Sequence, residues 1–380
     1  MVNRENANLY RDMQKDDLYY MNFALDEASK GVGRTSPNPM VGAIIVKDGK
    51  VVGKGYHKKA GTPHAEVHAL ADAGHAAKGA TLYVTLEPCN HTGRTPPCTQ
   101  AILHAEIARV VIGMSDPNPR VTGGGAEYLK SQGIEVRSGI LEQQCKALNR
   151  PFVKHSGTGL PWIIMKAGLS LDGKIAFCPG QGAALTGSES KRYVHQLRNQ
   201  VDAILIGVET ARIDNPSLTT RLEGVEKTRD PLRIVLDSGL RLPADVRMLN
   251  QLSSAETWIF CGEQASPERE KALVEAGAKI FRLPLAGERR VDLTELLRFL
   301  GQKNVTSILV EGGSRVHGAF YQQDLVDELL LFYAPFIIGD RGTPLVQGYS
   351  LGRRPEAPVL SDISVQSLGK DVLFHALIPK

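Results

Sequence analysis

The sequence reads HAE at residues 64–66 and EPCNHTGRTPPC at residues 87–98, and these two motifs decide its fold. They contain one imidazole and two thiols, those of His64, Cys89 and Cys98. Such ligands suit Zn²⁺, and three of them are typical of a catalytic zinc, whose fourth position holds a water with its pKa lowered to roughly 7. Glu66 adds a carboxylate that can take a proton from this water and return it to a leaving group. The motifs therefore predict a hydrolytic zinc site.

The spacing of the motifs indicates a class of reaction. A His-x-Glu motif followed by Pro-Cys is the signature of zinc deaminases, in which the second cysteine normally follows after two residues. Here eight residues separate Cys89 from Cys98. Two other interpretations exist, because these side chains could be ordinary buried residues, or a structural zinc could take His91 or His57 as its fourth ligand. Neither of them explains Glu66.

Composition sets the broad class of the protein. A chain of 380 residues is long enough for two domains, since single cores stop growing at roughly 250–300 residues. A net charge of +4, no run of Lys or Arg and 6% aromatic residues do not favour nucleic-acid binding, but they suit a small anionic ligand. Five cysteines argue against a disulfide framework and predict a reducing, cytoplasmic location. The sequence has neither a signal-peptide pattern nor an apolar run of about 18 residues, so no membrane association is expected.

The first half of the chain predicts an α/β sandwich. Residues 1–15 are polar and are expected to form an irregular N-terminal extension, followed by a zinc domain over residues 16–155. A helix is expected from Asp16 to Gly31, because apolar residues recur at helical spacing and glycines end the pattern. Further strands are expected at 40–46, in the segment up to 52, and at 81–86, 109–113 and 134–136. Further helices are expected at 62–71, with Val67, Leu70 and Ala71, and at 98–105 and 141–149.

The helix that follows Pro63 limits how the zinc motif can work. Positions two apart on a helix face roughly 200° away from each other, so His64 and Glu66 can share a site only if His64 precedes the regular helix. Thr62 and Pro63 are residues that place a helix start at that point. Both cysteines are expected near strand-to-helix junctions, where backbone N–H groups can stabilise thiolates.

The second half predicts another α/β domain, over residues 160–380, after a linker of small residues at 155–159. Gly312-Gly313 follows an expected strand, so it is either a tight turn or a cradle for phosphate, although no G-x-G-x-x-G fingerprint is present. Lys166 and Arg221 are candidate phosphate partners or ordinary surface charges. Strands are expected at 162–169, 203–206, 233–236, 257–261, 307–310 and 328–332, and a helix at 293–300.

From about Asp16 to the C-terminus, the sequence resembles the bifunctional riboflavin biosynthesis family, in which a pyrimidine deaminase is fused to a reductase. In that family the two cysteines stand eight residues apart, as they do here. The matching segments are 35–42, 55–57, 64–66, 83–98 and 115–125 in the first half, and 165–166, 170–174, 202–221, 237–238 and 309–313 in the second. The resemblance implies a cytidine-deaminase-like three-layer α/β/α domain followed by a dihydrofolate-reductase-like α/β domain.

The resemblance also implies two consecutive reactions and two cofactors. One zinc ion per chain would serve removal of the 2-amino group from 2,5-diamino-6-(5-phosphoribosylamino)pyrimidin-4(3H)-one, with Glu66 carrying protons to the ring nitrogen and to the departing amine. NADPH would then reduce the ribosyl side chain of the deaminated product, in its open-chain or imine form, to ribityl. The expected partner is thus a phosphorylated pyrimidine, with neither nucleic acid nor membrane, in a homodimer or homotetramer.

Site residues carry over position by position from the family pattern. His64, Cys89 and Cys98 would bind zinc, Glu66 would be catalytic, and Asn38 and His57 would contact the deaminase substrate. The NADPH contacts would be Gly168, Ala184, Thr210, Asp214, Ser238, Gly313, Ser314, Arg315, Val316, His317, Gly318 and Ala319. The reductase substrate would be held by Lys166, Gly182, Arg198, Leu218, Arg221 and Glu311, with basic groups suited to its phosphate and Glu311 to hydroxyl or N–H donors.

One segment departs from the family. Where the family usually has a serine and a tryptophan, this chain reads Gly182-Ala183-Ala184-Leu185-Thr186, so contacts made by those side chains are missing. Two alternative functions stay open at this point. One is a deaminase of nucleosides or nucleic-acid bases with a C-terminal binding domain, and the other is a zinc-stabilised scaffold without turnover.

Overall fold

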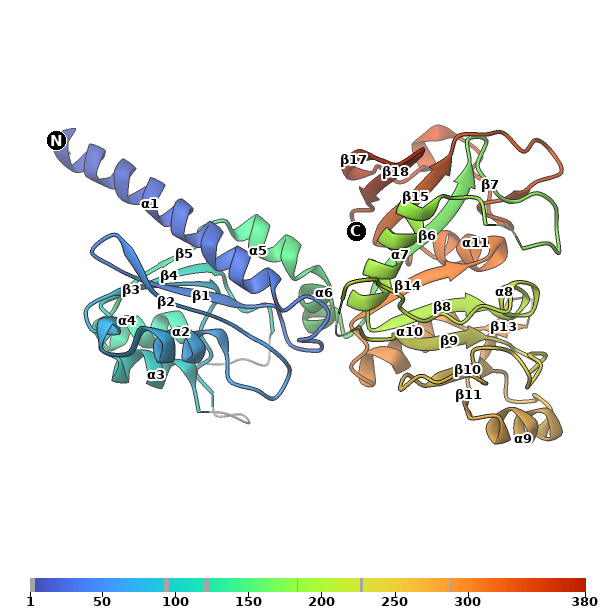
Figure 1. Cartoon of the computed structure of the whole chain (residues 1–380), viewed down its shortest axis with the longest axis horizontal. Coiled ribbons are helices and arrows are strands. Elements are labelled where there is room, and N and C mark those ends of the chain that lie inside the picture. Colours follow the sequence, from blue (N-terminus) through green and yellow to red (C-terminus); the bar gives the residue numbers. More distant parts are fainter. Residues whose placement is uncertain (1–3, 92–95, 119–123, 183, 226–227, 288) are drawn as a thin grey trace. The chain divides into compact units, whose positions relative to one another are not determined.

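The computed structural model describes residues 4–91, 96–118, 124–182, 184–225, 228–287 and 289–380, with the backbone alone for residues 4–15 and 355. Parts of the predicted features therefore lie outside the described residues, namely 92–95 between the two cysteines, 119–123 and Ala183. The chain divides into two compact units, Met1–Gly159 and Leu160–Lys380 (Figure 1). None of the helices that the structure describes is long and apolar enough to cross a membrane.

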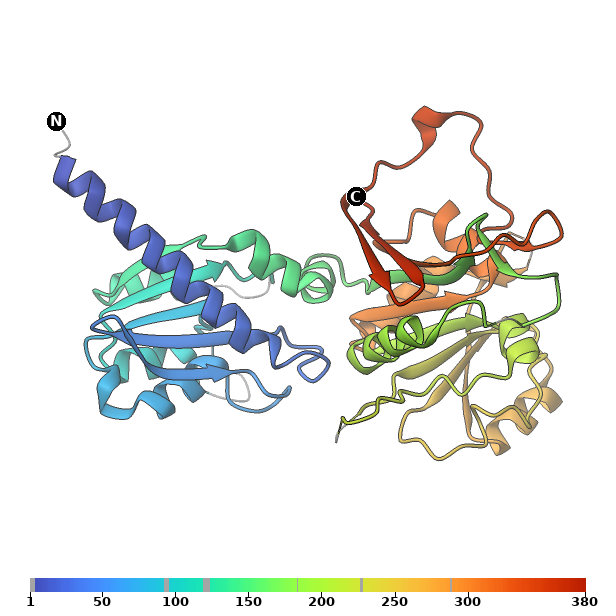
Figure 2. The same cartoon turned by 45° about the horizontal axis from the view of Figure 1, so that its top comes forward.

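The first unit is a five-stranded sheet in the order β2-β1-β3-β4-β5, covered by helices on both faces. Strand β1 runs antiparallel to β2 and β3, whereas β3, β4 and β5 are parallel. Helices α2, α3 and α4 cover one face and α1 and α5 the other (Figures 1 and 2). The strands are β1 (Gly42–Lys47), β2 (Lys50–Tyr56), β3 (Thr81–Leu86), β4 (Arg109–Met114) and β5 (Glu135–Ser138); the helices are α1 (Arg4–Ser29), α2 (Ala65–Ala73), α3 (Cys98–His104), α4 (Gly125–Ser131), α5 (Glu142–Leu148) and α6 (Arg150–Thr158), with a 3₁₀ turn at Gly74–Ala77.

Helix α1 begins at Arg4, so the prediction of an irregular segment up to residue 15 is wrong for residues 4–15. The sequence from Arg4 to Ser29 contains neither glycine nor proline, and nothing in it interrupts a helix that the apolar pattern after Asp16 already favours. The helix ends just before Gly31, as expected.

Asp17 fixes α1 to the sheet through a buried ionic network. Its carboxylate, 1% exposed, accepts two hydrogen bonds from Arg109 at 2.8 and 2.9 Å and one from Arg137 at 2.9 Å. The hydroxyl of Tyr83 donates a fourth at 3.0 Å. These partners stand on β3, β4 and β5, so one carboxylate holds the helix across three strands. A buried charge of this kind persists only when it is fully paired.

Helix α2 lies directly on the backbone of β2 because that strand carries glycines where the two elements touch. A Cβ atom on Gly55 would lie 2.5 Å from both Ala65 O and Ala69 N, and one on Gly53 would lie 2.4 Å from Ala69 O. The helix side of the contact is a stripe of small residues four apart, Ala65, Ala69 and Ala73, all buried. This stripe is the buried face, whereas Val67 and Leu70 are only partly buried and Ala71 is exposed.

The second unit contains a nine-stranded sheet in the order β11-β10-β9-β8-β14-β6-β15-β18-β17. The strands from β11 to β15 are parallel, and β18 and β17 continue the sheet antiparallel. All the strands expected here are present. The strands are β6 (Trp162–Ser170), β7 (Lys174–Ala176), β8 (Ala203–Gly207), β9 (Leu232–Leu236), β10 (Thr257–Cys261), β11 (Ala278–Arg282), β12 (Leu285–Ala286), β13 (Arg290–Val291), β14 (Ser307–Gly312), β15 (Glu328–Ala334), β16 (Thr343–Pro344), β17 (Ser361–Leu368) and β18 (Asp371–Leu377).

Two hydrophobic clusters cover the two faces of this sheet. One contains the buried leucines of α10 and Phe320 of α11, and the other contains Val194 of α7, Ala211 of α8 and Leu273 of α9. Helices on both faces are what a largely parallel sheet requires. The helices are α7 (Ser188–Gln200), α8 (Val208–Asp214), α9 (Pro267–Glu275), α10 (Leu293–Gln302) and α11 (Ser314–Gln322), with a 3₁₀ turn at Arg354–Glu356.

The residues expected to form a linker are helical instead. Residues 155–158 belong to α6, which has Asn149 as its N-cap and Pro151 in its first turn. Gly159 ends the helix with a φ of 73°, the left-handed conformation in which glycine closes helices without strain. Small polar residues therefore mark the end of a helix here, and Gly159 is the last residue of the first unit.

We expect Gly55→Ala to lower the free energy of unfolding of the first unit by at least about 2 kcal/mol and to lower its zinc content. The added methyl group must push α2 away from β2, and overpacking of this kind is costly. Urea unfolding followed by circular dichroism, together with metal analysis, measures both effects.

Gly157→Ala is the matched control, because a Cβ there meets nothing within 4 Å and the residue is helical. It should leave zinc binding unchanged and stabilise the fold slightly, by about 0.5–1 kcal/mol. Equal unfolding free energies for Gly55→Ala and the unmodified protein would contradict the close helix–strand contact.

Candidate active sites

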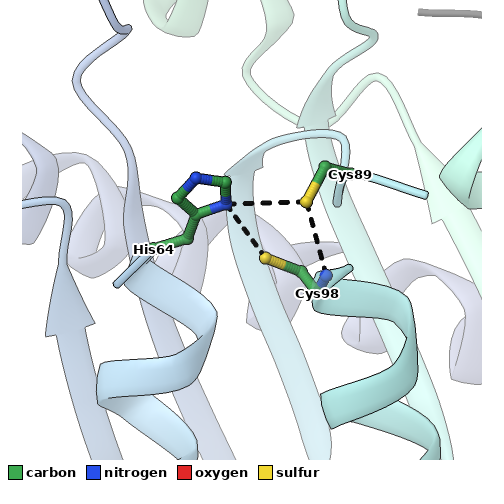
Figure 3. Close-up of side chains that lie close together, drawn as sticks. All are labelled: His64, Cys89 and Cys98. Carbon is green, nitrogen blue, oxygen red and sulfur yellow. Dashed lines mark hydrogen bonds between the residues drawn. The ribbon is translucent and has the colours of Figure 1, made fainter. Parts of the chain in front are cut away.

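The structure brings the three predicted zinc ligands together. His64 is the N-cap of α2, in extended conformation, as its shared site with Glu66 requires. Cys89 follows β3, and Cys98 is the first residue of α3. The Nδ1 atom of His64 lies 3.1 Å from Cys98 Sγ and 3.5 Å from Cys89 Sγ, and all three ligand atoms lie within 4.8 Å of one another (Figure 3). One nitrogen and two sulfurs at these separations fit a single zinc ion.

The local hydrogen bonds favour a thiolate at Cys89. The main-chain N–H of Cys98 donates to Cys89 Sγ at 3.3 Å (Figure 3). Side-chain hydrogen bonds from Cys98 and from His64 lower the pKa of the Cys89 thiol, against the effect of burial. Cys98 shows the opposite shift, because its thiol donates to Cys89 and is buried, and both effects raise its pKa. Binding of a metal would therefore release a proton from this pair.

Glu66 lies beside the cluster, where the Cys98 thiol contacts its carboxylate and one carboxylate oxygen is left without a partner. It is 3% exposed, and its Oε2 atom has no hydrogen-bond partner among the described residues. Burial raises the pKa of this carboxyl group. A buried polar group without a partner is destabilising, and such groups gather where substrate or water completes the contact.

His57 and Asn38 lie next to the cluster but do not extend it. The His57 ring interacts through Nε2 with Asn38 Nδ2 at 3.1 Å and through Nδ1 with Pro63 O at 3.2 Å. Its ring meets that of His64 edge-on, with 5.5 Å between centroids. Within the described ranges no fourth histidine, cysteine or carboxylate joins the three ligands. The structural-zinc alternative therefore has no fourth ligand here.

Glu87 is a site residue that the sequence reasoning missed. Its carboxylate accepts N–H hydrogen bonds from Asp116 at 3.3 Å and from Ala126 at 3.0 Å. The carbonyl of the next residue, Pro88, packs so closely on Gly125 that a Cβ there would lie 1.8 Å away. Glu87 thus joins the loop that carries Cys89 to the segments after β4. Its place directly before Pro-Cys was the available signal.

The second unit contains a cavity of about 1380 Å³. Of the predicted reductase residues, Gly318 does not line it, because the α11 helix turns that position against the backbone of Gln347, where a Cβ would lie 2.1 Å from the carbonyl oxygen. All the others do line it: Lys166, Gly168, Gly182, Ala184, Arg198, Thr210, Asp214, Leu218, Arg221, Ser238, Glu311, Gly313, Ser314, Arg315, Val316, His317 and Ala319.

A largely buried ion cluster joins the middle of β6 to the carboxyl end of β14. The guanidinium of Arg198 donates two hydrogen bonds to Glu311, at 3.0 and 2.8 Å, and the Nζ atom of Lys166 lies 3.7 Å from the same carboxylate. Burial alone would raise the pKa of Glu311, but the charges of Arg198 and Lys166 outweigh it and lower that pKa to about 2. Burial lowers the pKa of Lys166.

The turn from β14 into α11 fits a phosphate of a dinucleotide. Gly313 has a φ of 86°, and a Cβ there would lie 2.6 Å from Thr210 Oγ1, so only glycine suits the position. No side chain caps the first turn of α11. The Ser314 hydroxyl is buried without a hydrogen-bond partner in the described chain, and the buried His317 ring lies against the backbone of Val310 and Leu345. Free N–H groups at a helix start together with such polar atoms form an anion site.

Two further positions explain how the cavity is shaped. Leu218 has a φ of 53°, which is strained for a leucine and turns its backbone in an unusual direction beside the cavity. A Cβ on Gly182 would lie 1.8 Å from Asp214 Oδ1. The glycine that replaces the usual serine thus leaves room that the Asp214 carboxylate occupies.

Comparisons with known proteins show the family of the chain. The family model of the RibD C-terminal domain matches residues 161–374, which is more than half of the chain. The chain belongs to the RibD family. Residues 14–114 match the zinc-binding region of cytidine and deoxycytidylate deaminases. The riboflavin biosynthesis protein RibD of Bacillus amyloliquefaciens is 41% identical over 95% of this chain and 96% of its own length, and that of Escherichia coli is 41% identical over 94% and 98%.

Solved structures show the same relation. RibD of Acinetobacter baumannii superposes with a TM-score of 0.87 at 34% identity, covering 97% of this chain and 100% of that one. A deaminase/reductase from Thermotoga maritima superposes with a TM-score of 0.84, also at 34% identity and with the same coverage. The predicted family, the fold class of a deaminase-like domain followed by a reductase domain, and the two activities in riboflavin biosynthesis are confirmed. Zinc serves the deaminase domain and NADPH the reductase domain of this family.

We expect removal of zinc by a chelator to abolish ammonia release while the first unit stays folded. The three ligands stand at the edge of a hydrophobic core that extends over all five strands and does not depend on them. The melting temperature should fall, because zinc binds the folded state and its removal takes away that stabilisation. The unfolding transition should remain cooperative. Circular dichroism before and after chelation measures this, and loss of the folded signal would instead indicate a structural zinc.

Proposed function

We propose that this chain deaminates 2,5-diamino-6-(5-phosphoribosylamino)pyrimidin-4(3H)-one and then reduces the ribosyl side chain of the product to ribityl, yielding 5-amino-6-(5-phosphoribitylamino)uracil. The observation that carries the proposal is the meeting of His64, Cys89 and Cys98 beside the Glu66 carboxyl, one oxygen of which has no partner in the described chain. The name of the Thermotoga maritima relative, a diaminohydroxyphosphoribosylaminopyrimidine deaminase and 5-amino-6-(5-phosphoribosylamino)uracil reductase, supports the choice of substrates. A C-terminal binding module does not fit a reductase domain at residues 161–374.

In the first domain, the residues divide into metal ligands and a proton carrier. His64, Cys89 and Cys98 would hold zinc, which supplies a Lewis acid that lowers the pKa of a water. Glu66 would take a proton from the water that attacks the carbon bearing the 2-amino group and deliver it to the ring nitrogen. It would then move the second proton, from the hydroxyl on that carbon, to the departing amine, so that ammonia leaves and a carbonyl group remains. A carboxyl whose pKa is raised by burial can both accept and donate in this way. Asn38 and His57 would orient the ring.

In the second domain, NADPH supplies the hydride. Its phosphates would lie on the free N–H groups at the start of α11, with Ser314 and His317 completing their contacts. Glu311 stays ionised because Arg198 and Lys166 pair with it, so it can accept hydrogen bonds from sugar hydroxyls. Lys166 would orient the carbon that receives the hydride. The remaining NADPH and substrate contacts keep the roles that the family pattern implies.

Three broader points belong to the same proposal. The deaminase domain would extend over residues 16–155 and the reductase domain over 160–380, which the division into two compact units supports. The enzyme would be cytoplasmic, as the five free cysteines suggest. It would work as a homodimer or homotetramer without nucleic acid.

Glu66→Gln should keep zinc but lose ammonia release by a factor of about 10²–10⁴, because the amide cannot carry protons while its size is unchanged. Ammonia release from the diaminopyrimidine phosphate and metal content measure this. NADPH oxidation with the deaminated intermediate is the control and should be unaffected, since Glu66 belongs to the other unit. Deamination at near the unmodified rate would contradict the role of Glu66.

Glu311→Gln should show the reverse selectivity. Loss of the charge leaves Arg198 and Lys166 buried and unpaired, so NADPH oxidation with the deaminated intermediate should fall by at least about 10²-fold. Ammonia release from the first substrate should stay unchanged. If the unmodified protein does not oxidise NADPH with this intermediate, the proposed reductase function is wrong.

A further inference from the structure

Helix α7 turns a polar face towards the reductase cavity. Lys191, Val194, His195 and Arg198 all line the cavity, and their spacing of three and four residues places them on one side of the helix. His195 is the member of this face that neither the motifs nor the family pattern singled out. It is partly buried. Two arginines lie near it, Arg198, which has an ion-pair partner, and Arg221, which has none in the described chain.

The two arginines near His195 differ in how their charge is compensated. Arg198 gives two hydrogen bonds to Glu311 and a third to Thr219 O at 3.2 Å, so its charge is compensated within the protein. Arg221 lines the same cavity, is exposed, and makes no ion pair with any residue that the structure describes. The cavity is therefore open to an anion at Arg221.

His195 is joined directly to that position. The main-chain N–H of Arg221 donates to His195 Nδ1 at 3.2 Å. A ring nitrogen that accepts a hydrogen bond carries no proton, so the neutral ring has its proton on Nε2. Burial first, and then the charges of Arg198 and Arg221, lower the pKa of His195 to about 4, against weaker opposite effects of Glu311 and of the Thr219 backbone. At neutral pH the ring is thus an uncharged donor with a fixed tautomer.

We propose that His195 donates its Nε2–H to the phosphate group of the reductase substrate and forms, together with Arg221, the phosphate end of this site. The inference rests on the proposed function. The proposal assigns the two ends of the cavity to two parts of the substrate. The sugar would bind at the paired cluster of Glu311, Arg198 and Lys166. The phosphate would bind at the unpaired cation and the neutral donor. An uncharged donor strengthens binding of the anion and is not repelled by the two neighbouring guanidinium groups.

The test compares two substrates of the reductase reaction, the deaminated intermediate and the same compound without its phosphate. His195→Ala should raise KM about tenfold or more for the phosphorylated compound, the loss expected for a hydrogen bond to a charged group, with kcat little changed. KM for the compound without phosphate should stay the same. Gln196→Ala, on the exposed side of the same helix, is the matched control and should change neither. An equal rise for both compounds would overturn the proposal.

A double variant separates a direct contact from an effect through Arg221. If His195 only holds the Arg221 backbone in place, His195→Ala will have no further effect on KM when Arg221 is already alanine, and the proposal is then wrong. If it donates to the phosphate itself, the phosphate-specific loss persists in the Arg221→Ala background. His195→Gln should restore part of the affinity, because its amide can also donate.

This outcome is distinguishable from failure of the proposed function. Absence of NADPH oxidation by the unmodified protein with the deaminated intermediate would refute the reductase assignment itself. If the unmodified protein turns over normally and His195→Ala has the same ratio of KM values for the two compounds as the unmodified protein, only the role of His195 is refuted.

Discussion

The deaminase site depends on the contact between α2 and the backbone of β2. Gly53 and Gly55 remove the side chains that would separate the two elements, and the alanine stripe of α2 fills the space. The first residues of the helix are fixed as a result. His64 can then stand at the N-cap with its ring towards the cysteines, while Glu66, two residues later, turns into the interior. Two residues that a regular helix would separate thus share one site.

The reductase site obtains its geometry from parallel strands rather than from a close helix contact. Strands β8, β14 and β6 are neighbours and run in the same direction, so the residues at their carboxyl ends meet at one edge of the sheet. Glu311 comes from the carboxyl end of β14, Lys166 from the middle of β6 beside it, and Thr210 from the helix after β8. Helix α7 adds Arg198 from the side. The charges are close together because the strand order brings them there, although they are far apart in the sequence.

The sequence was informative where chemistry or a strong pattern acts locally. The zinc ligands, the start of α2 and the parallel strands of the second unit follow from short motifs and apolar runs. The prediction of a linker at residues 155–158 was wrong, because small polar residues suit both a linker and the last turn of a helix that ends at Gly159. Glu87 and His195 were missed for another reason. Their partners, Asp116 and Ala126 for the first and Arg221 for the second, lie more than 20 residues away, and only the fold brings them together.

The two buried carboxyl groups differ as their proposed tasks require. Glu66 is buried beside His64 and the two cysteines, one of its oxygens has no partner in the described chain, and burial raises its pKa. Glu311 is held by Arg198 and Lys166, which lower its pKa to about 2 despite burial, so it keeps its charge. A group that must move protons gains from an oxygen without a partner, whereas a group that must orient hydroxyls gains from two cationic partners. The same residue type therefore serves proton transfer in one domain and binding in the other, and the surrounding charges decide which.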